Sequence, residues 1–331
     1  MILQTAICIG QNPNPSVPLD EYIMDEMQAE HFPGVATVIV KNGEIVWLQC
    51  YGFADIENGI TVTDSTQFLL ASMSKLFTGT ATMQLKEDGM LQLNNDINEY
   101  LPWPINHPVQ STIPMTIQQL MTHTSSIKDN WSAMSNYYGY PDPTISLEAC
   151  MQDYFTVTGQ NYNANQNFLS APPGTVFNYS NMATALNGYI TEIVSSMPFD
   201  DYCDEHIFEP LCMEKTAWHM ADLDSNEVAR PYSYSNGNFI ANPHYGFADY
   251  PDGQLRSSIT DLANYMIAFL NGGSLGSNAI LSPSSVSEMW TQQIPSIESK
   301  QGLNWYKELL YHSGGETLLW GHNGGELGVS T

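Results

Sequence analysis

The sequence has few basic residues. Its 331 residues include nine lysines and arginines against 35 aspartates and glutamates, which gives a formal net charge of −26. Such a chain repels phosphate backbones and anionic lipid surfaces, so no nucleic-acid partner is expected. Charged residues of both signs reach only 13%, about half of the usual ~25%. No run of about 18 apolar residues is present, so the sequence predicts no membrane-spanning helix.

Cysteine is also scarce and carries no metal-binding pattern. The five residues are odd in number and form no C-x-x-C pair: Cys8, Cys50, Cys150, Cys203 and Cys212. This argues against a disulfide framework or a thiolate metal site, so we expect free buried thiols, with a Cys203 to Cys212 bridge as the alternative. The eight histidines show no H-E-x-x-H spacing, and no glycine-rich phosphate loop is present. We expect neither a metal nor a cofactor.

The N-terminal residues differ from the remainder of the chain. Residues 1–10 are apolar and lead into a Pro/Asn-rich stretch, an arrangement similar to the end of an export signal without its basic start. We interpret residues 1–19 as an N-terminal segment, potentially a signal remnant, and expect a periplasmic or extracellular location. Residues 20–331 are expected to form one domain, with a sheet region (20–79 and 211–331) and a helical region (80–210).

Local patterns predict several elements. Residues 35–40 and 44–51 are rich in β-forming residues and meet at Asn42-Gly43, which favours a tight hairpin turn. A second Asn-Gly at 58–59 turns the chain toward residues 67–70. Apolar residues at helical spacing predict a helix that begins at or just before Ser72. Two further helix starts are expected where the sequence has capping boxes, at Thr116 with Gln119 and at Ser258 with Asp261.

The order of these elements indicates a mixed fold. Residues 80–210 are expected to be helical, with no strand pattern among them, whereas strand-like stretches return at 305–312 and 316–322. We therefore expect the N-terminal and C-terminal strands to share one sheet, with helices inserted between them. The Asn-rich tract at 161–167 is expected to be a mobile surface loop.

A Ser-x-x-Lys motif at Ser72 and Lys75 is the first candidate for chemistry. On a helix, this spacing places both side chains on one face, where the lysine can take or relay the serine proton. The chain holds a second copy at Ser125 and Lys128, but that copy lies in a polar turn. Ser72 is expected at a helix N-terminus, where its amide could bind an oxyanion. These contexts favour Ser72 as the nucleophile over a plain helix cap.

Two other segments could join this motif. Tyr179 stands where an extended segment opens a helix, and a tyrosine base working near pH 7 needs its pKa lowered by about three units, roughly 4 kcal/mol. A neighbouring ammonium in a dry cleft could supply this energy. His322 stands in W-G-H-N-G-G, where glycines permit a close ligand approach. Taken alone, each segment is more often a packed aromatic or an ordinary glycine-rich turn.

Ser-x-x-Lys, Tyr-x-Asn and His-x-Gly occur in this order, and the sequence from about Asp20 to Thr331 resembles the serine β-lactamase and penicillin-recognising superfamily. It is most similar to the branch of class C β-lactamases, D-alanyl-D-alanine carboxypeptidases, D-amino-acid peptidases and related esterases. The fold that this resemblance implies is α/β (α+β): an antiparallel sheet flanked by helices, an all-helical domain, and the site between them.

The resemblance also implies residue roles. Ser72 is acylated, Lys75 and Tyr179 manage its proton, and the amides of Ser72 and Gly325 form the oxyanion hole. Substrate contacts would come from Asn181, His322, Asn323 and Gly324. His322 stands where many relatives have Lys, so we expect the affinity for carboxylate-bearing substrates to depend on pH near 6.5. Asn323 stands where Thr is frequent, and the family continues beyond Thr331, so the chain is expected to be truncated.

The sequence therefore predicts a serine hydrolase with a Ser72 acyl-enzyme, acting on D-amino-acid peptides, β-lactams or esters. The first alternative is a catalytically silent module that binds peptides or a protein. The second is an α/β-hydrolase that uses Ser274 of G-G-S-L-G (272–276), which requires a doubly wound parallel sheet. We interpret that segment as the loop after a helix, because it follows DLANYMIAFL. The oligomeric state is not predicted.

Overall fold

The computed structural model describes residues 14–312 and 314–331, so the apolar start of the chain and Cys8 lie outside the described residues. In this part of the chain, the α-helices are α1 (Val17–Glu30), α2 (Ser74–Glu87), α3 (Ile117–Met121), α4 (Trp131–Met134), α5 (Leu147–Phe155), α6 (Asn181–Ser195), α7 (Phe199–Cys203), α8 (Ile259–Leu270) and α9 (Pro283–Met289). Shorter helical segments are η1 (Ala71–Met73), η2 (Ile97–Glu99), η3 (Ser135–Tyr137), η4 (Asp204–Phe208), η5 (Met220–Asp222) and η6 (Tyr250–Asp252). No described helix is long and apolar enough to cross a bilayer.

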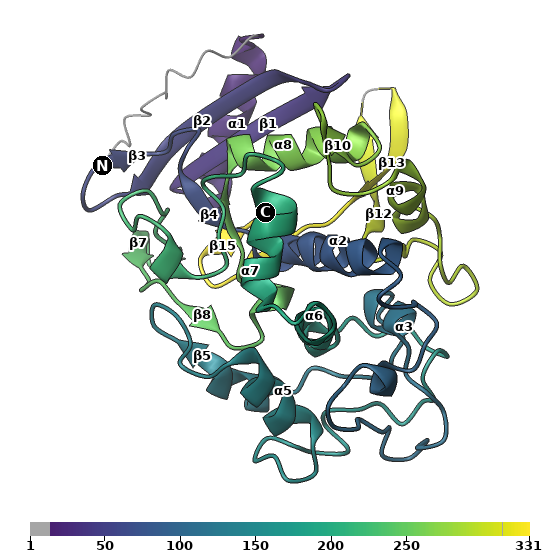
Figure 1. Cartoon of the computed structure of the whole chain (residues 1–331). Helices are drawn as coiled ribbons and strands as arrows, with labels where there is room; N and C mark the ends of the chain where they lie inside the picture. Colours follow the sequence, from purple (N-terminus) through teal and green to yellow (C-terminus); the bar gives the residue numbers. More distant parts are fainter. Residues whose placement is uncertain (1–13, 313) are drawn as a thin grey trace.

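In the described residues, the strands lie mainly before residue 70 and after residue 231 (Figure 1). They are β1 (Gly34–Lys41), β2 (Glu44–Asp55), β3 (Ile60–Thr61), β4 (Gln67–Leu69), β5 (Tyr138–Gly139), β6 (Tyr232–Ser235), β7 (Asn238–Ala241), β8 (Gly246–Phe247), β9 (Arg256–Ser258), β10 (Ser274–Leu275), β11 (Asn278–Ala279), β12 (Tyr306–His312), β13 (Gly315–Gly321), β14 (Gly325–Glu326) and β15 (Val329–Ser330). The described pairings between these strands are all antiparallel.

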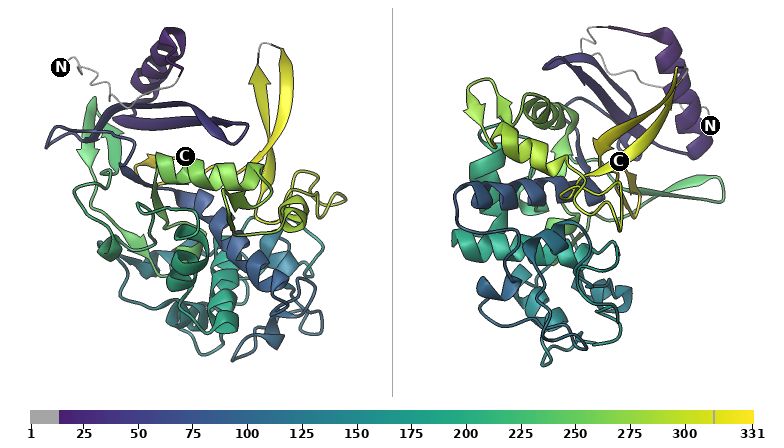
Figure 2. Two further views of the ribbon diagram at one scale, coloured as in Figure 1. Left: turned by 45° about the horizontal axis from the view of Figure 1, so that its top comes forward. Right: turned by 90° about the vertical axis from the view of Figure 1, so that its right-hand side faces the viewer.

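The predicted N-terminal hairpin is confirmed. β1 pairs with β2, and Asn42 and Gly43 between them take positive φ angles of 55° and 78°, as a tight turn of this type requires. Successive side chains of a strand point to opposite faces. Trp47 and Tyr51 of β2 therefore pack with α1 residues such as Met27, whereas Leu48 packs in a second cluster that includes Ile259 of α8. The sheet thus lies between α1 and α8 (Figure 2).

The predicted helix starts are confirmed as well. Thr116 and Gln119 form a reciprocal capping box at the start of α3, and the Ser258 side chain accepts a hydrogen bond from Asp261 N at the start of α8. Each cap satisfies backbone N–H groups that have no partner within the helix. The helix predicted near Ser72 begins with the turn η1 and continues as α2.

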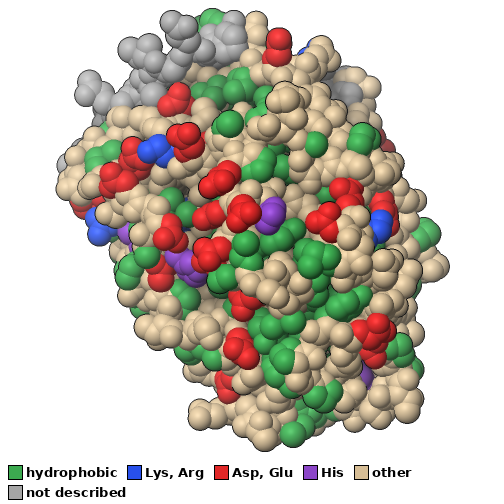
Figure 3. Space-filling model, in the orientation of Figure 1, with side chains coloured by type: hydrophobic (Ala, Val, Ile, Leu, Met, Phe, Trp, Pro, Cys, Tyr) green, Lys and Arg blue, Asp and Glu red, His purple; other side chains and the backbone are tan. Residues whose placement is uncertain are grey.

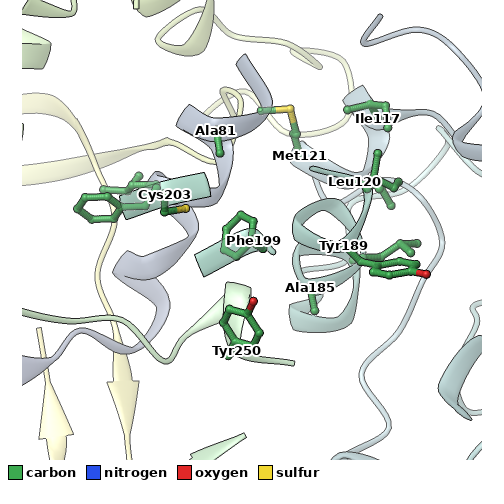
Figure 4. Close-up of a cluster of buried hydrophobic side chains, with 14 of the residues drawn as sticks. Ala81, Ile117, Leu120, Met121, Ala185, Tyr189, Phe199, Cys203 and Tyr250 are labelled. Carbon is green, nitrogen blue, oxygen red and sulfur yellow. The ribbon is translucent and has the colours of Figure 1, made fainter. Parts of the chain in front are cut away.

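The largest core surrounds α2 and the helices of the second region. Ala81 of α2, Leu120 of α3 and Ala185 of α6 are each fully buried. Phe199 of α7 and Tyr250 of η6 lie in the same cluster, with ring centres 5.8 Å apart (Figure 4). Because these helices bury apolar side chains toward α2, they fix the position of α2 and of the turn η1 before it, where the serine of the motif lies.

The C-terminal strands differ from the expectation of one shared sheet. In the described residues, β1, β2 and β3 form one sheet, and β12 pairs only with β13 in a separate hairpin, which extends away from the N-terminal sheet (Figure 2). The sequence pattern identified the strands correctly but not their partners, because pairing depends on backbone edges that meet only in three dimensions. The helical region also contains a strand that the sequence did not predict, since β5 pairs with β8.

The Asn-rich tract lies largely at the surface, as expected, since Asn163 and Asn165 are exposed, but its ends are held by hydrogen bonds. Asn167 is fully buried, and its side-chain amide donates to the main-chain oxygens of Tyr154 and Asn161. Asn161 in turn donates to the carboxylate of Asp153. The asparagine side chains replace secondary structure by hydrogen bonding to the backbone of their surroundings.

The remaining expectations about cysteines and charge have clear outcomes. Cys203 and Cys212 are free thiols, so the alternative bridge is not formed. Cys203 is buried as predicted, but Cys212 is exposed.

Acidic side chains are spread over the face shown in Figure 3, where Lys and Arg are few. The antiparallel sheet with flanking helices and a helical region agrees with the predicted fold class.

Candidate active site

Ser72 lies in η1, between β4 and α2. The chain is fixed just before it, because β4 pairs with β9 and Leu70 N donates to Leu255 O at 2.8 Å. Ala71 is fully buried and takes a φ of 48°. A residue other than glycine in this left-handed region costs about 1–3 kcal/mol and persists only where its surroundings hold it. The fold therefore imposes a strained backbone on the residue that precedes the candidate nucleophile.

Lys75 follows Ser72 by one helical turn, and the two side chains are in contact. Its Nζ donates to Ser72 Oγ at 3.0 Å and to the main-chain oxygen of Asp252 at 2.6 Å, and the side chain is fully buried. Burial alone would lower the pKa of Lys75, but the neighbouring Tyr179 and Asp252 outweigh this effect and raise it above the ordinary value. Lys75 is therefore an ammonium group at neutral pH and donates to the serine oxygen.

The segment that contains Asp252 is attached to the first turns of α2. Thr78 Oγ1 donates to Pro251 O at 2.6 Å, and Ser74 Oγ accepts from Leu255 N at 3.1 Å. Together with Lys75, two other side chains of α2 thus bind the main chain of residues 251–255. The Ser-x-x-Lys helix cannot shift without breaking these buried hydrogen bonds, each of which would leave unsatisfied groups.

Tyr179 approaches the Lys75 ammonium from the segment just before α6. The Nζ atom lies 5.1 Å from the centre of the Tyr179 ring, and a hydrogen bond between the two side chains contributes to the raised pKa of Lys75. The next residue, Ser180, is the N-cap of α6. Asp129 accepts hydrogen bonds from Ser180 Oγ and from the N–H groups of Asn181 and Met182. A carboxylate at this helix N-terminus is favourable and fixes Tyr179 and Asn181 beside it.

The sequence interpretation missed His123 as a site residue. Its ring lies 4.4 Å from that of Tyr179, and Nδ1 accepts from Ser180 N at 3.3 Å. Burial, and then the positive charge of Lys75, lowers the pKa of His123 well below its ordinary value. The neutral imidazole therefore holds Tyr179 in position. No local sequence pattern marked this histidine.

The amides of Ser72 and Gly325 are available as donors. No hydrogen bond from Ser72 N is present in the described residues. Gly324 and Thr331 exchange both backbone hydrogen bonds at 2.9 Å, so the next pair, Gly325 with Ser330, is of the non-hydrogen-bonded type. The Gly325 N–H therefore points away from β15. Ser72 and Gly325 line the same cavity, and their role as the two donors of an oxyanion hole stays a prediction.

His322 and Asn323 are held by Tyr306, a residue of β12 that the sequence did not indicate. The Tyr306 hydroxyl donates to Asn323 Oδ1 at 2.5 Å and accepts from Asn323 N at 3.1 Å, and its ring lies 4.8 Å from that of His322. His322 Nδ1 donates to Asn323 O at 2.5 Å. Tyr306 thus fixes the position of the loop that contains His322 and Asn323, two of the predicted substrate contacts.

The expected titration of His322 near pH 6.5 is not supported. Burial, and then the positive charge of Lys75, lowers the pKa of His322 to about 3. The imidazole is therefore neutral at physiological pH and does not replace the permanent cation that many relatives have there. Recognition of a substrate carboxylate by a charged His322 is thus not expected.

A cavity of about 220 Å³ opens above Ser72. It is lined by Ser72, Trp131, Met134, Tyr138, Tyr179, Asn181, Phe247, Asp249, Asp252, Gly253, Gly325 and Glu326. Four of the predicted residues therefore meet at one cavity, with Lys75 buried beneath it, whereas His322, Asn323 and Gly324 lie outside its lining. The acidic side chains were not predicted, because no sequence pattern marked them. A second hollow of about 420 Å³ contains none of the predicted site residues.

The competing serines lack such surroundings. Ser125 is buried, and its Oγ accepts from Ile127 N, while Lys128 donates to Asn165 O rather than to Ser125. Ser274 lies in the short hairpin of β10 and β11 that follows α8. Since the described strand pairs are antiparallel, the doubly wound parallel sheet that an α/β-hydrolase requires is contradicted.

Comparisons with known proteins agree with this geometry. The model of the β-lactamase family matches residues 19–331. Protein flp of Staphylococcus aureus (strain MW2) is 28% identical over 262 residues, which cover 76% of this chain and 48% of that protein. This chain therefore spans about half the length of that curated relative.

Solved structures are similar over most of this chain. An octameric penicillin-binding protein homologue from Pyrococcus abyssi is 25% identical with a TM-score of 0.71, over 93% of this chain and 68% of that one. D-amino acid amidase from Ochrobactrum anthropi SV3, complexed with L-phenylalanine amide, is 22% identical with a TM-score of 0.68, over 93% and 83% of the two chains. The second similarity concerns the fold alone.

Similarity to the class C branch in particular stays a prediction. The family match over residues 19–331, together with the Ser72 site, shows that the chain belongs to the β-lactamase family.

Proposed function

We propose that this chain is a serine hydrolase that works through an acyl-enzyme on Ser72. The observation that carries the proposal is the hydrogen bond of 3.0 Å from the buried Lys75 ammonium to Ser72 Oγ, at the floor of a cavity that Tyr179 also lines. Because Lys75 donates to Ser72 Oγ, the serine's own hydroxyl hydrogen is directed elsewhere. Tyr179 is the neighbouring group that can accept it.

Acylation follows from these positions. In this proposal Tyr179 reacts as its phenolate, and the nearby Lys75 ammonium stabilises the negative charge on its oxygen before the proton arrives. Ser72 Oγ attacks the substrate carbonyl carbon, a C–O bond forms, and the serine proton moves to the Tyr179 oxygen. The carbonyl oxygen becomes an oxyanion that the N–H groups of Ser72 and Gly325 bind. When the tetrahedral intermediate collapses, the bond to the leaving nitrogen or oxygen breaks, and the leaving group takes the proton from Tyr179.

Deacylation repeats the same steps with water. A water molecule attacks the ester carbonyl carbon and gives a proton to Tyr179, and the oxyanion again lies at the amides of Ser72 and Gly325. Collapse breaks the bond to Ser72 Oγ, which recovers its proton from Tyr179. The carboxylic acid leaves and the enzyme returns to its starting state.

The substrate classes proposed are D-amino-acid peptides, β-lactams and esters. Similarity in fold to an enzyme named as a D-amino acid amidase supports an amide substrate, and membership of the β-lactamase family supports the β-lactam class. A periplasmic or extracellular location is part of the same proposal. Activity of a longer protein that contains this chain is also a proposal.

Covalent labelling tests the nucleophile. Wild-type protein treated with a fluorophosphonate is expected to gain one adduct by intact-protein mass spectrometry, and peptide mapping should place it on Ser72. Ser72→Ala should gain none, whereas Ser125→Ala and Ser274→Ala should be labelled as wild type. An adduct on Ser125 or Ser274 would contradict the assignment. Absence of labelling in a folded wild-type protein would instead favour the silent binding module.

A further inference from the structure

The hairpin that carries Gly325 is separate from the longer strands. Within the described part of the chain, β14 pairs only with β15, whereas β13 pairs with β12 and ends at Gly321. Gly324 and Thr331 close the hairpin with two backbone hydrogen bonds, and Thr331 Oγ1 donates to Leu70 O at 2.9 Å. A two-stranded hairpin is only marginally stable by itself, so contacts with the rest of the protein must hold Gly325 at the cavity.

Two tyrosines bind the residues that directly follow Gly325. The Tyr245 hydroxyl donates to Leu327 O at 2.9 Å. The Tyr138 hydroxyl donates to the Glu326 carboxylate, whose two oxygens lie 3.3 and 3.4 Å away. Burial, and then the charge of Glu326, raises the pKa of both tyrosines. Both hydroxyls therefore keep their protons at neutral pH and remain donors to the hairpin.

The two tyrosine rings are packed in one cluster. Tyr245 is 2% exposed, and its ring stacks with that of Tyr138 at a distance of 6.0 Å between the ring centres. The pairing of β5 with β8 places Tyr138 opposite Phe247, with ring centres 5.3 Å apart. Leu69 and Val329 belong to the same cluster. Because a tyrosine has only two side-chain torsions, packing of its ring also fixes the position of its hydroxyl.

A buried arginine fixes the main chain of Tyr245. Arg256 is 2% exposed and lies on β9, which pairs with β4 just before the turn of Ser72. Its guanidinium donates to the main-chain oxygens of Tyr245 at 2.5 Å and of Gln254 at 3.3 Å. The strand pair that leads to Ser72 therefore also supports, through Tyr245, the segment that follows Gly325.

We propose that Tyr245 and Tyr138 are positioning residues for acyl transfer, because they hold the segment after Gly325 so that its N–H stays directed at the oxyanion. The inference rests on the proposed Ser72 acyl-enzyme. Neither tyrosine takes or gives a proton in the reaction. A donor stabilises the oxyanion only when it is directed at the place where the charge develops, and a misplacement of about 1 Å can cost ~10²-fold in rate.

Phenylalanine substitutions remove the two hydroxyls and keep the rings. With p-nitrophenyl butyrate, Tyr245→Phe should lower kcat about tenfold, as expected for one lost hydrogen bond. KM should stay within about twofold, because the lost interaction acts only in the transition state. The double variant Tyr138→Phe/Tyr245→Phe should lose ~10²-fold in kcat, the effect of one lost oxyanion donor.

Phenylboronic acid tests the same donors without turnover. Its boron forms a bond to Ser72 Oγ and becomes a tetrahedral anion that resembles the intermediate. Its Ki should rise in each variant by the factor by which kcat/KM falls. Tyr51→Phe is the matched control, since Tyr51 is 1% exposed and its hydroxyl donates to Asp20 at 2.6 Å, outside the cavity lining. It should keep the wild-type kcat and Ki.

Hydrogen exchange measures the positioning directly. The amides of residues 324–331 should exchange faster in Tyr245→Phe than in the wild type, because the hairpin has lost a contact that holds it. Tyr51→Phe should leave the exchange of these residues unchanged. Equal exchange in Tyr245→Phe and the wild type would overturn the inference, whatever the kinetics show.

The outcomes separate the inference from the proposed function. Wild-type kcat in the double variant would overturn the inference and leave the hydrolase proposal intact, and so would a lower kcat with an unchanged Ki. An equal fall in Tyr51→Phe would also overturn it, since general destabilisation would then be the cause. A wild-type protein with neither turnover nor fluorophosphonate labelling of Ser72 would count against the proposed function itself. If Tyr245→Phe does not melt cooperatively, Tyr138→Phe alone decides the result.

Discussion

Gly324 lies against the backbone of Ser72. A Cβ atom at position 324 would lie 2.8 Å from Ser72 N and 2.5 Å from Leu70 O. Both atoms belong to the backbone, so neither can move aside as a flexible side chain would. The glycine therefore permits the close approach of the strand that carries Gly325 to the turn that carries the candidate nucleophile.

Gly324→Ala is expected to displace the two oxyanion donors from each other. Loss of one such donor costs ~10²- to 10³-fold in kcat, and the overpacking should reduce the free energy of unfolding by ~1–3 kcal/mol. Steady-state kinetics and chemical denaturation measure the two effects. Gly321→Ala is the matched control, because a Cβ atom there meets no atom within 4 Å. Equal activity of both variants would show that the close approach is unimportant.

Tyr179→Phe should slow acylation without unfolding the protein. The change keeps the ring beside His123 and removes only the hydroxyl, and loss of a general acid-base group costs ~10²- to 10⁴-fold. Single-turnover kinetics with an ester substrate measure the acylation rate, and thermal melting should be little changed. Tyr234→Phe on β6 serves as the control. Acylation at the wild-type rate in Tyr179→Phe would remove Tyr179 from the mechanism.

The pH dependence of KM should not contain a titration of His322. Because its pKa is lowered from 6.5 to about 3, the imidazole is neutral throughout the range from about pH 5 to 8. Wild type and His322→Asn should therefore show parallel profiles for a carboxylate-bearing substrate. A step near pH 6.5 in the wild type alone would contradict the structure.

The same shift affects stability. The folded state favours the neutral His322 imidazole more than the unfolded state does. The free energy of unfolding is therefore not reduced by His322 above about pH 6.5, and it decreases as the pH falls from there toward 3. Urea denaturation at several pH values should show the loss in the wild type and a smaller loss in His322→Asn. An equal acid dependence in the two proteins would indicate that His322 has no part in it.

Asp129→Ala should destabilise α6 and impair catalysis together. Its carboxylate accepts from Ser180 Oγ and from two backbone N–H groups, and loss of a helix cap costs ~0.5–2 kcal/mol. Since Tyr179 and Asn181 lie on either side of this cap, kcat should fall as well. Urea denaturation and kinetics measure both effects. Glu26→Ala, an exposed change on α1, should remain within ±0.5 kcal/mol; an equally mild result for Asp129→Ala would exclude the capping role.

Elements encoded by short-range patterns were predictable from the sequence. Asn42-Gly43 indicated the first hairpin because few other dipeptides accept two positive φ angles. Thr116 and Gln119 indicated a helix start because a capping box needs only residues three apart. The spacing of Ser72 and Lys75 on one helix face followed from the same periodicity.

Contacts between distant residues were not predictable in this way. The bond from Lys75 to the main chain of Asp252 joins residues 177 positions apart, and no local pattern encodes it. The partner of β12 and the burial of Asn167 depend on the same long-range packing. The family resemblance placed Tyr179 and His322, but it gave no sign that three carboxyl groups would line the cavity.

Helix α2 is buried on all its sides along most of its length, from Ser74 to Met83. Such a helix has no exposed face from which it can open by itself, so its amide hydrogens should exchange with solvent only when the whole fold opens. The turn that carries Ser72 leads directly into this helix. Activity in denaturant should therefore decline in step with the folded fraction, with no earlier loss from local melting around the nucleophile.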